Sequence, residues 1–172
     1  MCWRYKELLF KGKYSNVYVK KQKILKVCTN TMNAYDCLMN EIQILKDLQT
    51  IDPKCGKFVR LISSGYNYYY MEYLPYCVID LIKTSNFETI SRKNIVTELF
   101  SALHFIHTRF LAHRDIKLEN IMMSHEHKIK LIDFGFACVL EENNSFVKRC
   151  VGSSHYIAPE AYIEESYCAY KA

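Results

Sequence analysis

The sequence predicts an α+β fold of two lobes, in which a small antiparallel β-sheet with one helix is followed by a mainly helical second lobe. Short segments rich in branched and aromatic residues, separated by glycine or by lysine-rich turns, dominate residues 1–74. After Pro75 the apolar residues recur at helical spacing instead. We therefore predict one unit at residues 1–74 and a second at residues 75–172, which meet near residues 72–75.

The first lobe is predicted to contain five strands and one helix. Its strand-like segments are short and rich in apolar residues, and they cover residues 6–12, 15–21, 23–28, 58–65 and 68–74. Residues 34–50 carry apolar side chains at the spacing of one helix face, namely Leu38, Ile42, Leu45 and Leu48. This spacing predicts a helix, which Pro53 and Gly56 end.

The second lobe contains a predicted helix over residues 91–110, with Ser91 as a candidate N-cap. One apolar stripe runs along this helix and consists of Ile95, Leu99, Leu103 and Ile106. A hairpin is predicted within residues 121–135, with its turn at residues 124–128. From Phe136 to Ala172 we predict irregular structure.

Composition and charge favour a soluble, cytoplasmic protein. No segment approaches the roughly 18–20 consecutive apolar residues that cross a bilayer, so we expect no membrane association. The eight cysteines form no CxxC pair, which disfavours a zinc or thioredoxin-type site. The net charge of +5 comes largely from basic residues near the N-terminus, which we assign to a solvated sheet face rather than to a phosphate-rich ligand. Nucleic-acid binding is not expected.

A cluster of polar residues, HRDIKLEN at positions 113–120, follows the second predicted helix and precedes a strand. A satisfied surface turn and a catalytic loop both explain such a cluster. Asp115, Lys117 and Asn120 lie within six residues, and a second carboxylate, Asp133, follows one hairpin later. Phosphoryl transfer needs a base that orients a hydroxyl, a cation for the moving phosphoryl group and oxygen ligands for Mg²⁺. These four residues supply such a set.

Three motifs resemble, in their order and spacing, those of the eukaryotic protein kinase family: HRDIKLEN (113–120), LIDFG (131–135) and GSSHYIAPE (152–160). The resemblance implies a bilobal protein-kinase-like fold and an ATP- and Mg²⁺-dependent enzyme that phosphorylates protein substrates. It implies that Asp115 accepts the proton of the substrate hydroxyl, and that Asn120 and Asp133 hold Mg²⁺. Lys117 would sit at the γ-phosphate, and its position is similar to that in serine/threonine kinases rather than tyrosine kinases.

The same resemblance assigns roles in the first lobe. Lys26 would pair the α- and β-phosphates, and Glu41 would hold that lysine in place. Without the later motifs, a solubilising lysine on an edge strand would be the better interpretation of Lys26. A stacked column that links the two lobes would consist of Leu45, His113 and Phe134.

The adenine pocket is implied to lie between the lobes. Its residues would be the gatekeeper Met71, the hinge Glu72–Leu74, and Val17 and Met122 on the two faces of the purine. The phosphate loop departs from the family pattern GxGxxGxV, because FKGKYSNV keeps only Gly12 and Val17. Residues other than glycine adopt the required conformations at a cost of roughly 1 kcal/mol or more. Ile24 also stands where the family has alanine, so we expect weaker or differently shaped ATP binding.

The segment from Asp133 to Glu160 departs from the pattern as well. Arg149 lies about where many relatives carry an activating phosphothreonine, which Arg114 would otherwise bind. We considered that Glu141 or Glu142 pairs with Arg114 instead, and alternatively that both glutamates are simply solvated. Ser153 matches the loop residue expected to bond Asp115 and Lys117.

The chain stops shortly after the APE motif, whereas the family continues with further helices. We therefore expected a truncated second lobe that leaves one face of helix 91–110 bare. This allows an alternative function, in which a catalytically weak kinase-like protein binds and modulates a full-length kinase through the exposed lobe. A broken fragment without function is the third possibility.

Overall fold

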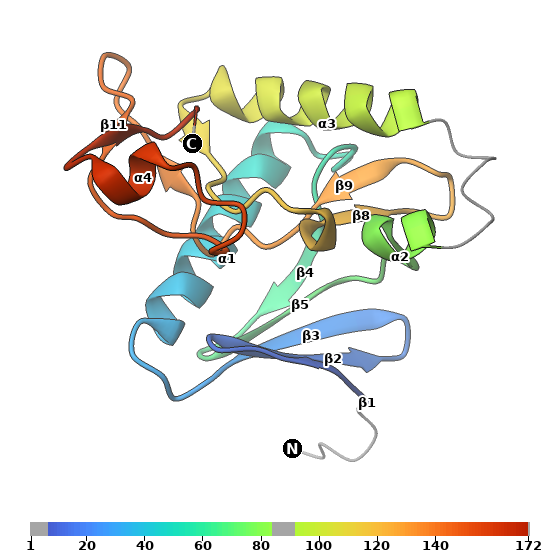
Figure 1. Cartoon of the computed structure of the whole chain (residues 1–172). Helices are drawn as coiled ribbons and strands as arrows, with labels where there is room; N and C mark the ends of the chain where they lie inside the picture. Colours follow the sequence, from blue (N-terminus) through green and yellow to red (C-terminus); the bar gives the residue numbers. More distant parts are fainter. Residues whose placement is uncertain (1–6, 84–91, 172) are drawn as a thin grey trace.

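The computed structural model describes residues 7–83 and 92–171. The first half comprises β1 (Glu7–Lys11), β2 (Ser15–Lys20), β3 (Lys23–Cys28), α1 (Ala34–Ile51), β4 (Leu61–Ser64) and β5 (Tyr68–Glu72). The second half comprises β6 (Tyr76–Cys77), α2 (Val78–Lys83), α3 (Arg92–His107), β7 (Leu111–Ala112), a 3₁₀ turn η2 (Leu118–Asn120), β8 (Ile121–Met123), β9 (Ile129–Leu131), β10 (Cys138–Val139), β11 (Phe146–Val147), α4 (Glu160–Ile163) and β12 (Tyr167–Cys168). Figure 1 shows the large sheet at one end of the molecule and α3 at the other. The predicted α+β class is confirmed.

The first five strands form an antiparallel sheet in the order β1-β2-β3-β5-β4. Strand β3 occupies the centre, where Lys26 pairs in register with Val17 of β2 and Tyr69 of β5. Because β3 has neighbours on both sides, the interpretation of Lys26 as an edge-strand residue is wrong. The predicted strand 58–65 begins only at Leu61, since Val59 donates its backbone N–H to the carbonyl of Leu131 instead.

Helix α1 lies beside the sheet and matches the predicted segment closely (Figure 1). It follows Asn33, whose φ of 64° places that residue in the left-handed region, and it ends one residue before Asp52. The face predicted from the apolar spacing is the buried one, and it also buries Glu41 at 1% exposure. A carboxylate buried in an apolar face needs a partner, and this partner defines the site described below.

The second half is built from small pieces around α3. A three-stranded sheet has the order β6-β8-β9, and residues 124–128 form the predicted turn between β8 and β9. The predicted irregularity of residues 136–172 is wrong in part, because β10 pairs with β7 and β11 pairs with β12. These strands are two residues long, too short to produce a periodic pattern in the sequence. Ser91, the predicted N-cap, lies outside the described residues.

Helix α3 is buried on one side only. Ile95 and Ile106 of the predicted stripe are 7% and 0% exposed, whereas Val96 and Phe100 on another face are 50% and 66% exposed. Buried residues of both halves form one hydrophobic cluster. Within it Phe58 contacts both Phe105 and Phe134, with ring centroids 5.5 and 5.8 Å apart. Among the described helices, none has the length and apolarity that a bilayer-spanning segment requires.

Candidate active site

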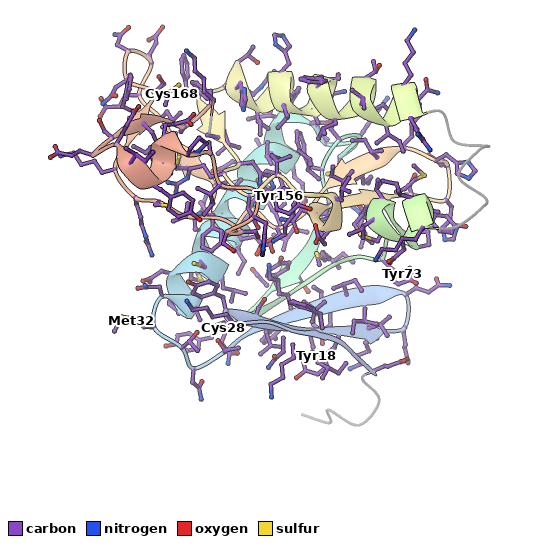
Figure 2. All side chains as sticks on the ribbon, viewed as in Figure 1. Tyr18, Cys28, Met32, Tyr73, Tyr156 and Cys168 are labelled. Atoms are coloured by element: carbon purple, nitrogen blue, oxygen red, sulfur yellow. The ribbon has the colours of Figure 1, made fainter. Side chains whose placement is uncertain are left out.

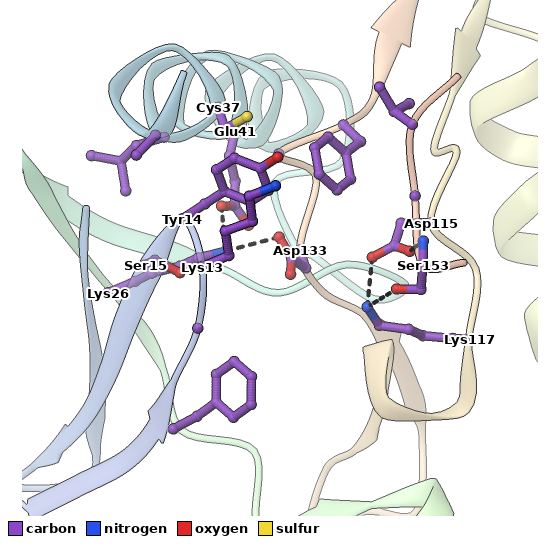
Figure 3. A pocket seen from close by; sticks show the side chains of 18 of the residues that line it. Lys13, Tyr14, Ser15, Lys26, Cys37, Glu41, Asp115, Lys117, Asp133 and Ser153 are labelled. Carbon is purple, nitrogen blue, oxygen red and sulfur yellow. Dashed lines mark hydrogen bonds and ion pairs between the residues drawn. The ribbon is translucent and has the colours of Figure 1, made fainter. Parts of the chain in front are cut away.

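The loop between β7 and η2 presents the polar cluster of residues 113–120 toward the sheet. Asp115 is 5% exposed, and each of its carboxylate oxygens has partners. Oδ1 accepts the backbone N–H of Ser153 at 2.9 Å, and Oδ2 accepts Lys117 Nζ at 2.8 Å and Asn120 Nδ2 at 3.0 Å. Lys117 Nζ also donates to Ser153 Oγ at 2.6 Å, as predicted for Ser153 (Figure 3). The surface-turn interpretation of the cluster is therefore excluded, because these groups are buried and bonded to one another.

On the opposite side, Lys26 joins β3 to α1 and to the segment after β9. Its ammonium donates to Glu41 Oε2 at 2.7 Å and to Asp133 Oδ1 at 2.8 Å (Figure 3). Burial acts to lower the pKa of Lys26, but the attraction of Asp133 and Glu41 outweighs it and holds the pKa well above its usual range. Burial likewise acts to raise the pKa of Asp133, and the charge of Lys26 reverses this effect and lowers it. The lysine is therefore charged and fixed at physiological pH.

Asp133 and Asn120 line one cavity, and both carry side-chain oxygens of the kind that bind Mg²⁺. Both hydrogen bonds of the Asn120 side chain use its amide nitrogen, which donates to the backbone oxygen and Oδ2 of Asp115. Its amide oxygen therefore stays available to an ion. The Asp133 side chain is 41% exposed, although Lys26 occupies Oδ1. Amide and carboxylate oxygens are the donors that Mg²⁺ prefers, so these two residues fit the ion that the sequence implied.

A second cavity, of about 450 Å³, lies beneath β1 to β3 and ends at the residues after β5. It brings together all the residues predicted for the adenine pocket, namely Val17, Met71, Glu72, Leu74 and Met122. Ile24, which stands where the family has alanine, also lines it. Sequence reasoning missed Ile132 and Leu9, which line the same cavity. Ile132 stands directly before Asp133, so its place beside the DFG motif was the available signal.

The predicted phosphate loop is the turn between β1 and β2. The backbone N–H of Gly12 donates to the carbonyl of Ser15 at 2.9 Å. A Cβ at Gly12 would lie 2.9 Å from that same oxygen, so the turn requires glycine at this one position. Gly12 lines the cavity that contains Asp115 rather than the adenine cavity. Phe10 is 63% exposed, so its large ring is not buried within the loop.

The column predicted from Leu45, His113 and Phe134 is buried, and its ring pair is in contact. The ring centroids of His113 and Phe134 lie 4.6 Å apart. Phe58 packs on Phe134 and was missed, because nothing in a lone aromatic residue before β4 distinguishes it from ordinary core. His113 Nε2 lies 3.0 Å from the carbonyl of Ile132, and Nδ1 accepts the backbone N–H of Asp115 at 3.3 Å. This assigns the proton to Nε2 of a neutral ring.

We expect the protein to lose stability in acid partly through His113. Burial lowers the pKa of His113 below its ordinary value of 6.5, against smaller opposing effects of Ile132 and the nearby carboxylates. Because the pKa of His113 is lowered in the folded state, its contribution to the free energy of unfolding is fully present above pH 6.5 and is lost as the pH falls. The free energy of unfolding, measured by denaturant titration at pH 7.5 and at pH 5.5, should therefore differ less between the two pH values in His113→Gln than in the wild type. His125→Gln, an exposed control, should behave as wild type; an equal pH dependence in all three proteins would contradict the assignment.

The segment after Asp133 is held without a glutamate partner for Arg114. Arg114 Nε donates to the carbonyl of Phe136 at 2.8 Å, and its terminal nitrogen lies 3.5 Å from the carbonyl of Arg149. The proposed pairing of Arg114 with Glu141 or Glu142 is therefore wrong, since both glutamates are exposed and Arg114 uses backbone oxygens instead. The physical reason is tertiary packing, which brings the backbone carbonyls of Phe136 and Arg149 to the guanidinium of Arg114.

Two residues of the catalytic region adopt positive φ angles, 62° at Arg114 and 65° at Asp133. Each such residue costs about 1–3 kcal/mol and persists because its surroundings fix it. Arg114 is fixed by the bonds described above, and Asp133 by Lys26. One of these two positions directly precedes the predicted catalytic Asp115, and the other is the predicted metal ligand Asp133.

Gly152 should tolerate no side chain. Its φ is 112°, and a Cβ there would lie 2.7 Å from the carbonyl of Arg114. Gly152→Ala is expected to displace Ser153 from Asp115 and to lower the free energy of unfolding by about 1–3 kcal/mol. Urea unfolding checks the stability, and Gly56→Ala, where a Cβ meets nothing closer than 3.9 Å, is the matched control. Equal stability of the two variants would show that the segment relaxes freely.

Comparison with known proteins agrees with this geometry. The family described as "Protein kinase domain" matches residues 5–172. A probable serine/threonine-protein kinase of Dictyostelium discoideum is 33% identical over 92% of this chain, and a probable casein kinase I homolog of Encephalitozoon cuniculi is 34% identical over 84%. Calcium-dependent protein kinase 3 of Plasmodium yoelii yoelii is 30% identical over 90% of this chain. The matches span 26%, 48% and 31% of these three relatives, so this chain corresponds to less than half of each.

Proposed function

We propose that this chain, which belongs to the protein kinase family, transfers the γ-phosphoryl group of ATP to serine or threonine hydroxyls of proteins. The observation that carries the proposal is the convergence of two ion-paired groups on one cleft. Lys26, with Glu41 and Asp133, lines the same cavity as Lys117 and Asn120. Asp115 shares hydrogen bonds with the latter two. A surface built only for binding has no physical need of both groups.

The residues of the chain divide the work of phosphoryl transfer among them. In the proposed mechanism, Asp115 orients the attacking hydroxyl and accepts its proton. Lys117 places its charge at the moving phosphoryl group, and Lys26 binds the phosphates that remain on the nucleotide. Positioning of this kind can supply about 7–11 kcal/mol of the barrier reduction, more than the base alone. Mg²⁺ held by Asn120 and Asp133 would neutralise the charge that develops on the phosphate oxygens.

The contact between Lys117 and Ser153 supports serine and threonine as acceptors. It ties the catalytic loop to the segment that precedes α4 by a 2.6 Å hydrogen bond. Tyr156 of that segment lines the cavity with Lys117 and lies near the middle of the molecule (Figure 2). The position of Lys117 in its motif, similar to that in serine/threonine kinases, supports the same acceptors.

The test is transfer of labelled γ-phosphate to a protein substrate, followed by identification of the phosphorylated amino acids. We expect phosphoserine and phosphothreonine in the presence of Mg²⁺, and loss of signal when EDTA removes the ion, because Asn120 and Asp133 then lack the cation they orient. Fluorescent nucleotide binding measured alongside separates loss of binding from loss of transfer. Phosphotyrosine as the main product, or transfer that persists in EDTA, would contradict the proposal. Nucleotide binding without transfer, together with co-purification of a full-length kinase, would favour the modulator function instead.

A further inference from the structure

The cleft holds two cations that the proposed mechanism does not use, Lys13 and Arg149. Both line the cavity of about 410 Å³ that also contains Asp115. The two other lysines of this cavity are paired with its carboxylates. Among the residues that the structure describes, neither Lys13 nor Arg149 forms an ion pair. The cavity therefore keeps two positive charges for a ligand.

Lys13 is presented by a fixed loop rather than by a mobile one. Its carbonyl accepts hydrogen bonds from the hydroxyls of Thr29 and Thr31, at 2.7 and 2.9 Å. Its ammonium lies 5.1 Å from the ring centroid of Tyr14, and this ring packs edge-on against Phe136 at 5.6 Å. Figure 3 shows Lys13 and Tyr14 together at the cleft, and Cys37 of α1 lines the same cavity. The tip of the loop is thus attached both to the segment between β3 and α1 and to the segment after Asp133.

Arg149 is presented in the same manner from the other side. Its carbonyl accepts the hydroxyl of Tyr167 at 2.8 Å and lies 3.5 Å from Arg114. Burial raises the pKa of the Cys37 thiol, and the charge of Arg149 acts against this rise. Cys37 lies on α1 and lines the same cavity, so the guanidinium acts toward the cleft. Lys13 and Arg149 are thus two exposed cations that line one cavity from opposite sides, with the backbone of each held by hydrogen bonds.

We propose that Lys13 and Arg149 bind an acidic side chain, a carboxylate or a phosphate, on the protein substrate close to the serine or threonine that is phosphorylated. The inference rests on the proposed function and names its substrate class as acidic or previously phosphorylated sequences. The planar guanidinium of arginine matches carboxylate and phosphate oxygens in pairs, and the lysine adds a point charge. The phosphates of the nucleotide are the competing ligand, and the test separates the two.

A panel of peptides tests the preference. Each peptide has one central serine. The peptides differ at a single flanking position, which carries glutamate, phosphoserine, glutamine or lysine. This position is moved one residue at a time along the peptide. We expect kcat/KM for the glutamate and phosphoserine peptides, at the best position, to exceed that of the glutamine peptide by about fivefold for each cation engaged. The preference should weaken as salt is raised, because exposed charges are screened.

Substitutions assign the preference to the two residues. Arg149→Gln and Lys13→Gln should each remove about fivefold of it and leave the KM for ATP unchanged. Lys148→Gln and Lys11→Gln are matched controls, since both are exposed neighbours that do not line the cavity and should keep the preference. Arg149→Glu should shift the preference toward the lysine peptide. A rise in the KM for ATP with an unchanged peptide preference would assign the cations to the nucleotide and overturn the inference.

Binding separates this inference from the proposed function. Fluorescent peptides with alanine in place of the central serine are titrated with the full chain, and their anisotropy is followed. Tighter binding of the glutamate peptide than of the glutamine peptide, lost in Arg149→Gln, supports the anion site even if no phosphate is transferred. Equal affinity for the two peptides overturns the inference, whereas transfer to the serine peptides would then leave the proposed function standing.

Discussion

Asp115→Asn is expected to reduce phosphate transfer by about 10²–10⁴-fold, the range that a general base contributes. The substitution keeps the shape of the side chain, so Oδ1 can still accept the backbone N–H of Ser153. It replaces the other oxygen with an amide nitrogen, which faces two donors, Lys117 and Asn120, at about the distances seen now. The variant therefore loses the base, the ion pair with Lys117 and the hydrogen bond from Asn120 Nδ2.

The measurement is steady-state transfer at saturating ATP, with nucleotide affinity determined separately. We expect the dissociation constant for the nucleotide to change little, because Asp115 does not line the adenine cavity. Glu126→Gln, in the exposed turn between β8 and β9, removes the same charge elsewhere and should retain full activity. Equal rates for the wild type and Asp115→Asn would remove Asp115 from the mechanism and, with it, the proposed enzyme.

Lys26→Met is the second change with a large expected effect, on stability as well as on transfer. Removing one partner of a buried ion pair costs about 3–5 kcal/mol, because the other charge stays buried alone. Here the orphaned group is Glu41, whose side chain is 1% exposed. Losing the ion pair with Asp133 lowers the free energy of unfolding by less, since the Asp133 side chain is 41% exposed and water screens its charge. We expect the free energy of unfolding to fall by about 3 kcal/mol.

A double-mutant cycle decides whether this loss is electrostatic. Glu41→Gln removes the buried charge, so Lys26→Met combined with Glu41→Gln should recover most of the stability that Lys26→Met loses. Lys128→Met, which breaks the exposed pair with Glu98, is the control and should cost less than about 1 kcal/mol. Additive losses in the double variant would mean that Lys26 acts through packing of its stem. Nucleotide binding should be weakened in every variant that lacks Lys26 and should be unchanged in Lys128→Met.

Much of the candidate site could be predicted because its chemistry is concentrated in short stretches. Asp115, Lys117 and Asn120 stand in one eight-residue run, and the structure brings all three together in one hydrogen-bonded group. Lys26 and Glu41 were predicted to pair, and they do so at 2.7 Å. Their catalytic and binding roles stay predictions until the variants above are measured.

Other features could not be predicted, because no local pattern encodes them. Arg114 contacts backbone carbonyls. Its positive charge had suggested a pairing with Glu141 or Glu142 instead. Carbonyls belong to every residue, so the sequence gives no sign of which one lies within reach. The pairing of β11 with β12 joins two-residue strands about twenty residues apart, which leaves no periodicity to detect. The orientation of Arg149 toward the cleft follows from these same contacts.

By itself the sequence determined the order of β1 to β5, α1, α3 and the β8–β9 hairpin, the buried face of α1 and the identity of the polar residues, since these depend on spacing and on side-chain chemistry within a few turns of chain. Only the tertiary structure decided that Lys26 lies on a central strand, that Ile132 and Phe58 join the site, and that Lys13 and Arg149 face one cavity. These are contacts between segments far apart in the chain. Their geometry is set by how the sheet, the helices and the loops pack against one another, and a one-dimensional pattern does not contain it.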